Sequence, residues 1–470
     1  GKIPANAVGS SELADNAVDT AAIADDAVTA DKIADGAVTA DRIGTGAVTE
    51  AKIQAFAVTE TKIGDQAVTL AKLPHGTSSN DGKFLRANNG ADPTFEEVVS
   101  VGQAHNIIMN GAMNVAQRAT SVASTGYKTV DRWQFGGSWG GSAITQEQAD
   151  VGYTTAPYDK GFRKSFKLTN SNQGSASAGD NIEITYSFEG RDIAASGWDY
   201  VNSSAKITLS FWIKSSVAQT FYGYFRTFEG TSAKYSFPIV CSTTGWEYKT
   251  VSIVGEGNFA QNVYNTFRMD NSRDLILRIV PFYGTDYTDS GAINNAWQNY
   301  SSSNITPVYD TSWFLTNGAT FELTGVQLEV GDTANDFSHE DYATTLTKCK
   351  RYYQRSTDSS RGTDYSLSTG TWHSADGVHS FSKHNNYYDW SEKFEVEMRA
   401  APTLTIYGSS NQGDIHIEQI GVGSSQVDWN NNTTEVKTKG FMLRHIEDSY
   451  GTSGSGNGFG IMAYTVDAEL

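Results

Sequence analysis

The first 73 residues are built from a ten-residue repeat, and this repeat limits the possible folds more than any other feature of the chain. Val recurs every ten residues from Val8 to Val68, and Ile or Leu recurs every ten residues from Ile3 to Leu73. The two apolar series are therefore offset by five residues. An odd offset puts them on opposite faces of a strand, and in a continuous α-helix the apolar stripe would spiral around the axis. The chain must therefore bend once in each repeat.

Local sequence chemistry predicts the form of that bend. In the copy GAVTADRIGT at 36–45, Thr39 occupies a helix N-cap position. Val38 and Ile43 then have the spacing of a hydrophobic staple across the helix start. An acidic residue followed by a basic one suits the helix dipole, and the Gly-containing segment that follows supplies a turn. Each repeat is predicted to be one short helix followed by one turn.

A one-turn helix is not stable alone, so several copies of the chain must wrap together to bury the apolar series. We expect three copies, which makes the protein a homotrimer with an intertwined shaft over 1–73. A disordered linker is the alternative, and the strict apolar register argues against it. The predicted trimer core of the shaft consists of Val18, Ile23, Val28, Ile33, Val38, Ile43, Val48, Ile53, Val58, Ile63, Val68 and Leu73.

The repeated motif AVT-x-x-K-I resembles the shafts of phage tail fibres and of head fibres in some short-tailed phages. That resemblance implies a supercoiled helix-turn-helix trimer, and it does not distinguish a tail fibre from a head fibre. A neck follows over 74–105, in which residues 76–98 resemble a short module common in phage fibres. We predict two small strands in the neck, at 83–87 and 94–99, around an Asn-Gly turn. A flexible linker is the alternative for this segment.

From residue 106 the pattern changes to short strands and turns, and the chain is rich in Gly (45), Tyr (23), Phe (22) and Trp (10). This composition favours β-sandwich or jelly-roll heads. The first head is placed at 106–345, with strands at 208–214, 274–279 and 320–330. Trp133 and Trp212 are interpreted as core residues. Gln327 and Glu329 alternate with apolar neighbours, which predicts a polar face that contacts solvent or another subunit.

Five stretches of this region resemble a β-sandwich module found in many phage fibres. That module is similar in shape to carbohydrate-binding jelly rolls and is non-catalytic in most members. A second β-sandwich head is placed at 346–470, with strands at 394–398, 403–407, 414–420, 440–446 and 459–468. Its segments 399–403 and 464–470 resemble the C-terminal domain of the same fibre family. The five stretches are 106–121, 129–135, 208–216, 321–332 and 349–355.

An aromatic and histidine cluster in a predicted loop region at 366–390 is the candidate ligand-binding site. Aromatic faces stack on the apolar face of a sugar ring, and neighbouring amides bind its hydroxyls. Packing in a core or between subunits is the alternative for this cluster. The spacing of its histidines fits no common metal-ligand motif, so we predict no metal and no cofactor. The candidate residues are Trp372, His373, His379, Tyr387, Tyr388 and Trp390.

Charge and composition exclude several functions. A net charge of −18 opposes nucleic-acid binding, which needs basic patches. No apolar run reaches the roughly 18 residues that a membrane span requires, so we predict no membrane insertion. Cys241 and Cys349 are too few for a disulfide framework, and we expect buried free thiols in a protein made in the host cytoplasm. GGSWG at 136–140 lacks the helix that a nucleophile elbow requires.

The sequence therefore predicts a mainly β, homotrimeric and non-enzymatic phage fibre protein of the virion. Its predicted role is that of a receptor-binding tail fibre that binds a host-surface glycan. A capsid-anchored head fibre for weak adhesion is the alternative, and a polysaccharide depolymerase is less favoured. We also expect attachment to a tail or capsid protein through a segment that precedes Gly1.

Overall fold

The computed structural model describes residues 4, 7–9, 14, 17–53, 58, 83–88, 91–97, 106–171, 173–228, 231–259, 267–356, 378–384, 387–407, 414–419, 423–428, 433–446, 457–461 and 463–470. Within 83–97, 378–390, 407–434 and 444–463 it describes the backbone alone. The chain divides into two units, 1–99 and 100–470, and each is described by itself.

Each well-described repeat contains one helical turn and one tight turn, as the sequence predicted. The helical turns are of the 3₁₀ type rather than the α type, because three residues allow only i to i+3 hydrogen bonding. Thr29 and Thr39 occupy the N-cap position without forming a side-chain cap, whereas Asp19 accepts the N–H of Ala22 at 2.9 Å. The 3₁₀ turns span Thr20–Ala22, Ala30–Lys32, Ala40–Arg42 and Glu50–Lys52.

The lysine of the repeat has a role that the sequence did not reveal. The ammonium of Lys32 donates to the carbonyl oxygen of Ala27 at 2.8 Å, and that of Lys52 donates to Ala47 at 3.0 Å. In these two repeats the lysine thus ties the end of the helical turn to the alanine five residues earlier. This bond accounts for the spacing between Ala and Lys in the AVT-x-x-K motif.

The predicted shaft core residues are exposed in the single chain. Their exposed fractions run from 43% at Ile33 to 56% at Val28, Val48 and Val58. The rows of apolar side chains are therefore not covered by the chain's own residues among those described. Val18, Ile23, Val38, Ile43 and Ile53 behave in the same way, whereas Ile63, Val68 and Leu73 lie outside the described residues.

The neck contains the two strands that the sequence predicted, with slightly different bounds. Strand β1 (Lys83–Asn88) pairs antiparallel with β2 (Ala91–Glu97), and Leu85 lies opposite Phe95. The register shifts between Arg86 and Asn88, next to the turn.

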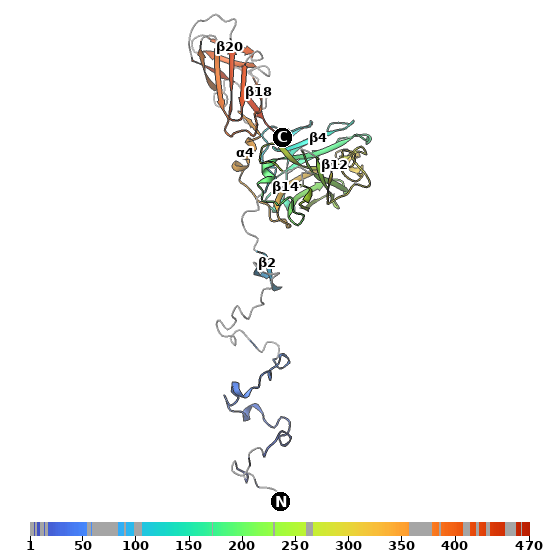
Figure 1. The fold of residues 1–470 in the computed structure, drawn as a ribbon, viewed down its shortest axis with the longest axis vertical. Helices are drawn as coiled ribbons and strands as arrows, with labels where there is room; N and C mark the ends of the chain where they lie inside the picture. The colour runs from blue at the N-terminus through green and yellow to red at the C-terminus, as the bar shows by residue number, and fades with distance from the viewer. Residues whose placement is uncertain are drawn as a thin grey trace. The chain divides into compact units, whose positions relative to one another are not determined.

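The second unit begins with a β-sandwich of two six-stranded antiparallel sheets, named here the β12 sheet and the β14 sheet (Figure 1). The order in the β12 sheet is β13 (Trp297–Asn299), β10 (Ala233–Val240), β9 (Thr220–Thr227), β12 (Arg273–Tyr283), β7 (Asn181–Glu189) and β4 (Trp133–Ser138). The order in the β14 sheet is β11 (Trp246–Val254), β8 (Lys206–Ser215), β14 (Thr320–Val330), β6 (Lys164–Thr169), β5 (Thr145–Asp150) and β3 (Ser121–Val122).

Alternation along the strands builds one continuous core between the two sheets. On β8, Leu209, Phe211 and Ile213 are fully buried in this core, so the residues between them face outward. Trp133 on β4 is also fully buried, which confirms its prediction as a core residue. Three short helices interrupt the strands, and they are α1 (Ala156–Asp159), α2 (Gly190–Ala194) and α3 (Ser312–Leu315).

A bulge in β14 receives the chain that enters the sandwich. The N–H of Val326 donates to the carbonyl of Gly111 at 3.0 Å, and the amide of Asn106 donates to the carbonyl of Val326 at 3.1 Å. A Cβ atom on Gly111 would lie 2.0 Å from that carbonyl oxygen, so only glycine fits there. The segment after residue 106 therefore replaces the pairing that the bulge interrupts.

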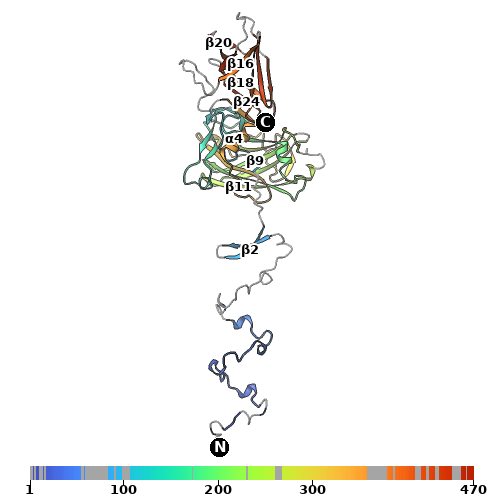
Figure 2. The same cartoon turned by 90° about the vertical axis from the view of Figure 1, so that its left-hand side faces the viewer.

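The second module follows helix α4 (Tyr342–Lys350), which the sequence did not predict. Its strands form a three-stranded and a seven-stranded antiparallel sheet (Figure 2). The order in the three-stranded sheet is β15 (Tyr353–Arg355), β24 (Ala463–Asp467) and β18 (Thr403–Tyr407). The order in the seven-stranded sheet is β20 (Gly423–Asp428), β19 (Asp414–Gln419), β23 (Asn457–Ile461), β16 (Val378–His384), β17 (Tyr387–Lys393), β22 (Gly440–Ile446) and β21 (Thr433–Lys437).

The prediction of a strand at 394–398 is wrong. Phe394 and Met398 are buried, but their N–H groups donate to the carbonyls of Lys439 and Thr438 outside any strand ladder. The N–H of Glu395 donates to the side-chain oxygen of Gln354 at 3.1 Å. The segment is therefore an irregular chain held by scattered bonds rather than a paired strand.

The end of the chain closes onto the first sandwich through buried charges. Arg132 is fully buried, and its guanidinium donates to the carboxylate of Glu469 at 2.5 Å and to the carbonyl of Ser187 at 2.6 Å. The same guanidinium stacks on the ring of Tyr352, 3.5 Å from its centroid. Arg118 likewise pairs with Asp467 at 3.0 Å. We call Arg118, Arg132, Tyr352, Asp467 and Glu469 the C-terminal clamp.

The thiols of Cys241 and Cys349 are free and buried, as predicted. Burial raises the pKa of Cys241 to about 12, so its thiol stays protonated near neutral pH. A buried neutral thiol behaves as a small apolar side chain.

Asp192 in helix α2 is expected to make the stability of the protein depend on pH. Burial, and then the neighbouring charge of Glu189, raise the pKa of Asp192 from 3.8 to about 6. The folded state therefore binds this proton more tightly, so the contribution of Asp192 to stability is favourable at low pH. It is lost as pH rises from about 4 to about 6. In wild type the free energy of unfolding should therefore fall by roughly 1–3 kcal/mol across this range. Asp192→Asn should abolish that fall, because asparagine does not titrate.

The measurement is the urea midpoint of wild type and Asp192→Asn between pH 4.5 and pH 7. The asparagine oxygen can still accept the N–H of Glu189, which bonds Asp192 at 3.1 Å. The two proteins should differ little at the acid end, and the variant should be the more stable at pH 7. If the urea midpoints of the two proteins change with pH in parallel, the pKa of Asp192 is not raised by folding.

Candidate functional site

A pocket of about 760 Å³ opens on the outer face of the β14 sheet. Its floor comes from β8 and β11, one wall comes from the chain around α1, and the other comes from the loop 331–339 after β14. Its aromatic lining consists of Phe162, Trp212, Tyr248, Phe337 and His339, which we call the aromatic pocket.

Two buried polar side chains of β14 hold the loop 331–339 over the sheet. Gln327 accepts the N–H of Ser338 at 2.8 Å. Glu329 accepts the backbone N–H of Asn335 at 2.9 Å and its side-chain amide at 2.7 Å. Gln327 is 0% exposed and Glu329 is 1% exposed, so the prediction that they face solvent or another subunit is wrong. Their role is to fix the wall of the pocket.

Three rings form the inner wall of the aromatic pocket. The centroids of Phe162, Phe337 and His339 lie 4.9 Å apart in each pairing, with tilted or edge-to-face geometry. The ring of Phe162 packs onto Gly325, which has a φ of +62°, and a Cβ there would lie 2.6 Å from that ring. His339 also bonds the carbonyl of Lys160 through Nε2 at 2.9 Å. The wall is therefore fixed by packing on both sides.

Trp212 and Tyr248 form the floor of the aromatic pocket. They lie opposite each other on β8 and β11, with ring centroids 5.2 Å apart at a 47° tilt. Tyr248 is 44% exposed, and Trp212 is partly buried and lies outside the sandwich core. The prediction that Trp212 belongs to the core is therefore wrong.

The rim of the pocket is polar. Asp159, Lys160, Asn335 and Asp336 lie around it, and Lys160 pairs with Asp336 at 3.6 Å. Both side chains of this pair are largely exposed, so the pair contributes little to stability. Aromatic faces surrounded by hydrogen-bonding groups can bind a ligand that has both an apolar face and hydroxyl groups.

The described part of the region that the sequence selected, 378–384 and 387–390, lies elsewhere, in the second module. The prediction of a loop is wrong for 378–384 and 387–390, which belong to β16 and β17. The pairing of Lys383 with Tyr388 puts positions 379, 388 and 390 on one face of the seven-stranded sheet and position 387 on the other. Trp372 and His373 lie outside the described residues, and a binding role for the cluster stays a prediction.

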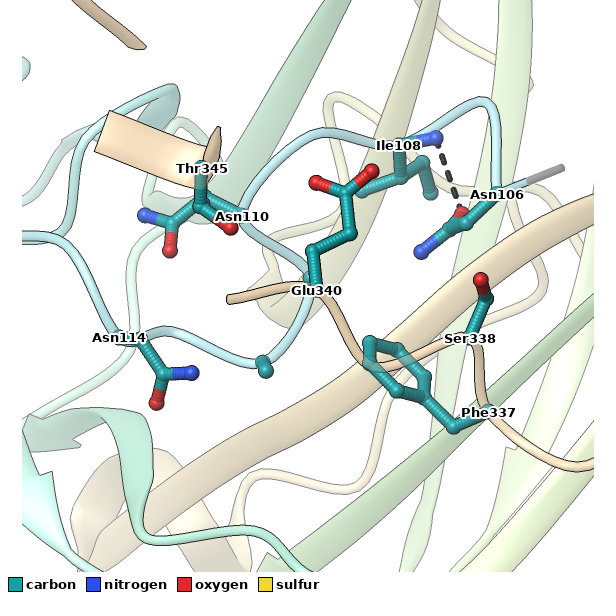
Figure 3. Close-up of a pocket in the computed structure, with 10 residues that line it drawn as sticks. Asn106, Ile108, Asn110, Asn114, Phe337, Ser338, Glu340 and Thr345 are labelled. Carbon is teal, nitrogen blue, oxygen red and sulfur yellow. Dashed lines mark hydrogen bonds between the residues drawn. The ribbon is translucent and has the colours of Figure 1, made fainter. Parts of the chain in front are cut away.

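A much smaller cavity of about 20 Å³ lies beside the start of the sandwich, and Phe337 lines both this cavity and the aromatic pocket (Figure 3). It has room for about one water molecule. The side-chain oxygen of Asn106 accepts the N–H groups of Ile108 and Leu328, each at 3.0 Å. These bonds fix the backbone at the β14 bulge, so the cavity is structural.

Within the described ranges, His, Cys, Asp and Glu nowhere gather in a group of three or more that could hold a metal ion. Among the same residues, none of the helices combines the length and the apolar character of a membrane span.

No family model and no curated protein matches this chain. A solved structure of a family 16 carbohydrate-binding module is 10% identical, with a TM-score of 0.18, and the match covers 36% of this chain and 77% of that one. TmCBM61 in complex with β-1,4-galactotriose is 10% identical, with a TM-score of 0.23, over 48% and 99%. A cyclase from Fischerella sp. TAU in complex with 4-(1H-indol-3-yl)butan-2-one is 8% identical, with a TM-score of 0.26, over 48% and 98%. Such distant matches do not choose among functions.

Proposed function

We propose that this protein is a non-enzymatic phage fibre subunit, which binds a host-surface glycan in the aromatic pocket. The observation that supports this proposal is the pairing of partly exposed rings with a polar rim. Trp212 and Tyr248 offer ring faces to the pocket, and Asn335, Asp159 and Asp336 offer groups that can bind hydroxyls. Sugars present an apolar ring face and a polar edge, so they match this lining.

The N-terminal repeats support the fibre part of the proposal. Each described repeat leaves a Val and an Ile about half exposed, and completing their burial contributes about 1 kcal/mol each, half the value for a fully exposed side chain. A second and a third copy of the same chain carry matching rows at the same spacing. We therefore assign the rows to a trimeric shaft that projects the sandwich modules from the virion.

Binding of the intact protein to an array of bacterial surface glycans tests the proposed site. Tyr248→Ala is expected to weaken binding of the best glycan about five-fold, because one stacked ring contributes about 1 kcal/mol. Tyr342→Ala removes an equally aromatic and exposed side chain that does not line the pocket, and it should leave binding unchanged.

Equal binding by both variants would place the glycan site elsewhere, and the strand positions around Tyr388 and Trp390 would then be the next to test.

Immunogold electron microscopy of virions distinguishes the two kinds of fibre. Label at the tail supports a receptor-binding tail fibre, whereas label over the capsid supports a head fibre.

A further inference from the structure

A row of alternating charges crosses the outer face of the β14 sheet beside the aromatic pocket. The register places Glu147, Lys167, Glu322 and Lys214 opposite one another in turn on β5, β6, β14 and β8. Trp246 on β11 lies opposite Lys214 and ends the row. We call the four charged residues the charged ladder.

The ladder is neutral as a whole, because two ammonium groups face two carboxylates. Lys214 pairs with Glu322 at 2.9 Å, and Lys167 pairs with Glu147 at 3.2 Å. The other carboxylate oxygen of Glu322 accepts the hydroxyl of Ser165 at 3.3 Å. Each ammonium has three donor hydrogens, so these pairs leave donors available next to the carboxylates of Glu322, which is buried, and Glu147, which is partly exposed.

A second pocket of about 420 Å³ lies over this ladder. Lys167, Lys214, Glu322 and Trp246 form its floor. Trp246 and Tyr248 are two residues apart on β11, so they share a face of the sheet at a spacing of about 7 Å. The second pocket is therefore the neighbour of the aromatic pocket on the same face, and it brings one more ring.

We propose that the two pockets form one binding surface for an uncharged oligosaccharide, with one sugar at Trp212 and Tyr248 and another at Trp246. This inference rests on the proposed glycan function and names the ligand class. Neutral hydroxyls both donate and accept, which matches a floor of alternating ammonium and carboxylate groups. An acidic sugar that bound a free donor of Lys214 would bring its carboxylate against that of Glu322, and otherwise it would have to take Lys214 from Glu322.

That exchange is unfavourable because Glu322 is only 6% exposed. A carboxylate that is buried and loses its partner is strongly destabilised. The exposed rim adds Asp150, Asp159 and Asp336, of which Asp150 pairs with Lys164 and Asp336 pairs with Lys160, and the chain carries a net charge of −18. The surface therefore selects against uronates, sialic acids and phosphorylated glycans.

The test uses the intact protein on an array of neutral and acidic glycans. Calorimetry then follows the best neutral binder, its shorter fragments and its C6-oxidised, uronate-containing form. We expect the oligosaccharide to bind at least ten-fold more tightly than its monosaccharide and than the oxidised form. Trp246→Ala should weaken binding of the oligosaccharide about five-fold and leave the monosaccharide unchanged.

Glu322→Gln gives the opposite test, because it keeps the shape of the side chain and frees the charge of Lys214. This variant should bind the oxidised form more tightly than wild type does. Preference of wild type for acidic glycans, or equal affinity for monomer and oligomer, overturns the inference while the proposed function stands. Absence of binding to any glycan overturns the proposed function itself. Tyr342→Ala serves as the control for both variants.

Discussion

Glu469→Ala is expected to lower the free energy of unfolding by about 3–5 kcal/mol, the largest effect of any single substitution proposed here. The reason is the environment of Arg132, which is 0% exposed and pairs with Glu469 at 2.5 Å. Removal of the carboxylate leaves a buried guanidinium without its counter-ion. The remaining bond to the Ser187 carbonyl does not neutralise the charge.

Guanidinium unfolding followed by tryptophan fluorescence measures this effect, because Trp133 lies in the same module. Glu435→Ala is the matched control, since Glu435 forms an exposed ion pair with Lys437 and its loss should change stability by less than about 1 kcal/mol. Equal midpoints for the two variants would show that the C-terminal clamp does not stabilise the first sandwich.

The double substitution Val38→Asp and Val48→Asp is expected to abolish assembly of the shaft. Both side chains are more than half exposed in the single chain, so their burial depends on other copies. Each substitution removes about 1 kcal/mol of apolar burial per chain and forces a carboxylate into the interface. Light scattering coupled to size-exclusion chromatography should report a trimer for wild type and a monomer for the double variant.

Aspartate at Thr39 and Thr49 is the control, because it adds the same charge one residue away at an N-cap position that favours Asp. This variant should remain trimeric. Monomeric wild type, or a trimeric Val38 and Val48 variant, would contradict the assignment of the apolar rows to the interface between chains.

The sequence was informative where periodicity alone decides the structure. The five-residue offset predicted one helical turn in each repeat, and alternation located β14, β18 and β22 to the residue. It failed at Phe394 and Met398, whose apolar character reflects burial in irregular chain. The α4 helix was missed because its buried residues are only Thr345 and Cys349, which give no apolar periodicity.

The aromatic pocket was not predicted, because its parts come from segments more than 150 residues apart between Phe162 and Phe337. One local signal did exist. Phe211 and Ile213 belong to the core, so strand alternation alone directs Trp212 outward. The same alternation pairs Trp246 with Tyr248 on one face of β11. The covering loop gives no such signal, since its position depends on the buried side chains of Gln327 and Glu329.

The C-terminal clamp also sets an order on biosynthesis. Glu469 follows Arg132 by 337 residues, so a ribosome adding about 5–20 residues per second needs roughly 20–70 s to deliver the partner. The first sandwich is complete only after β14 has been made, so it would contain an uncompensated buried cation while the 139 residues from Val330 to Glu469 are added. A chain released early never acquires the missing carboxylate. Translation as far as Glu469 is therefore a checkpoint that shorter products fail.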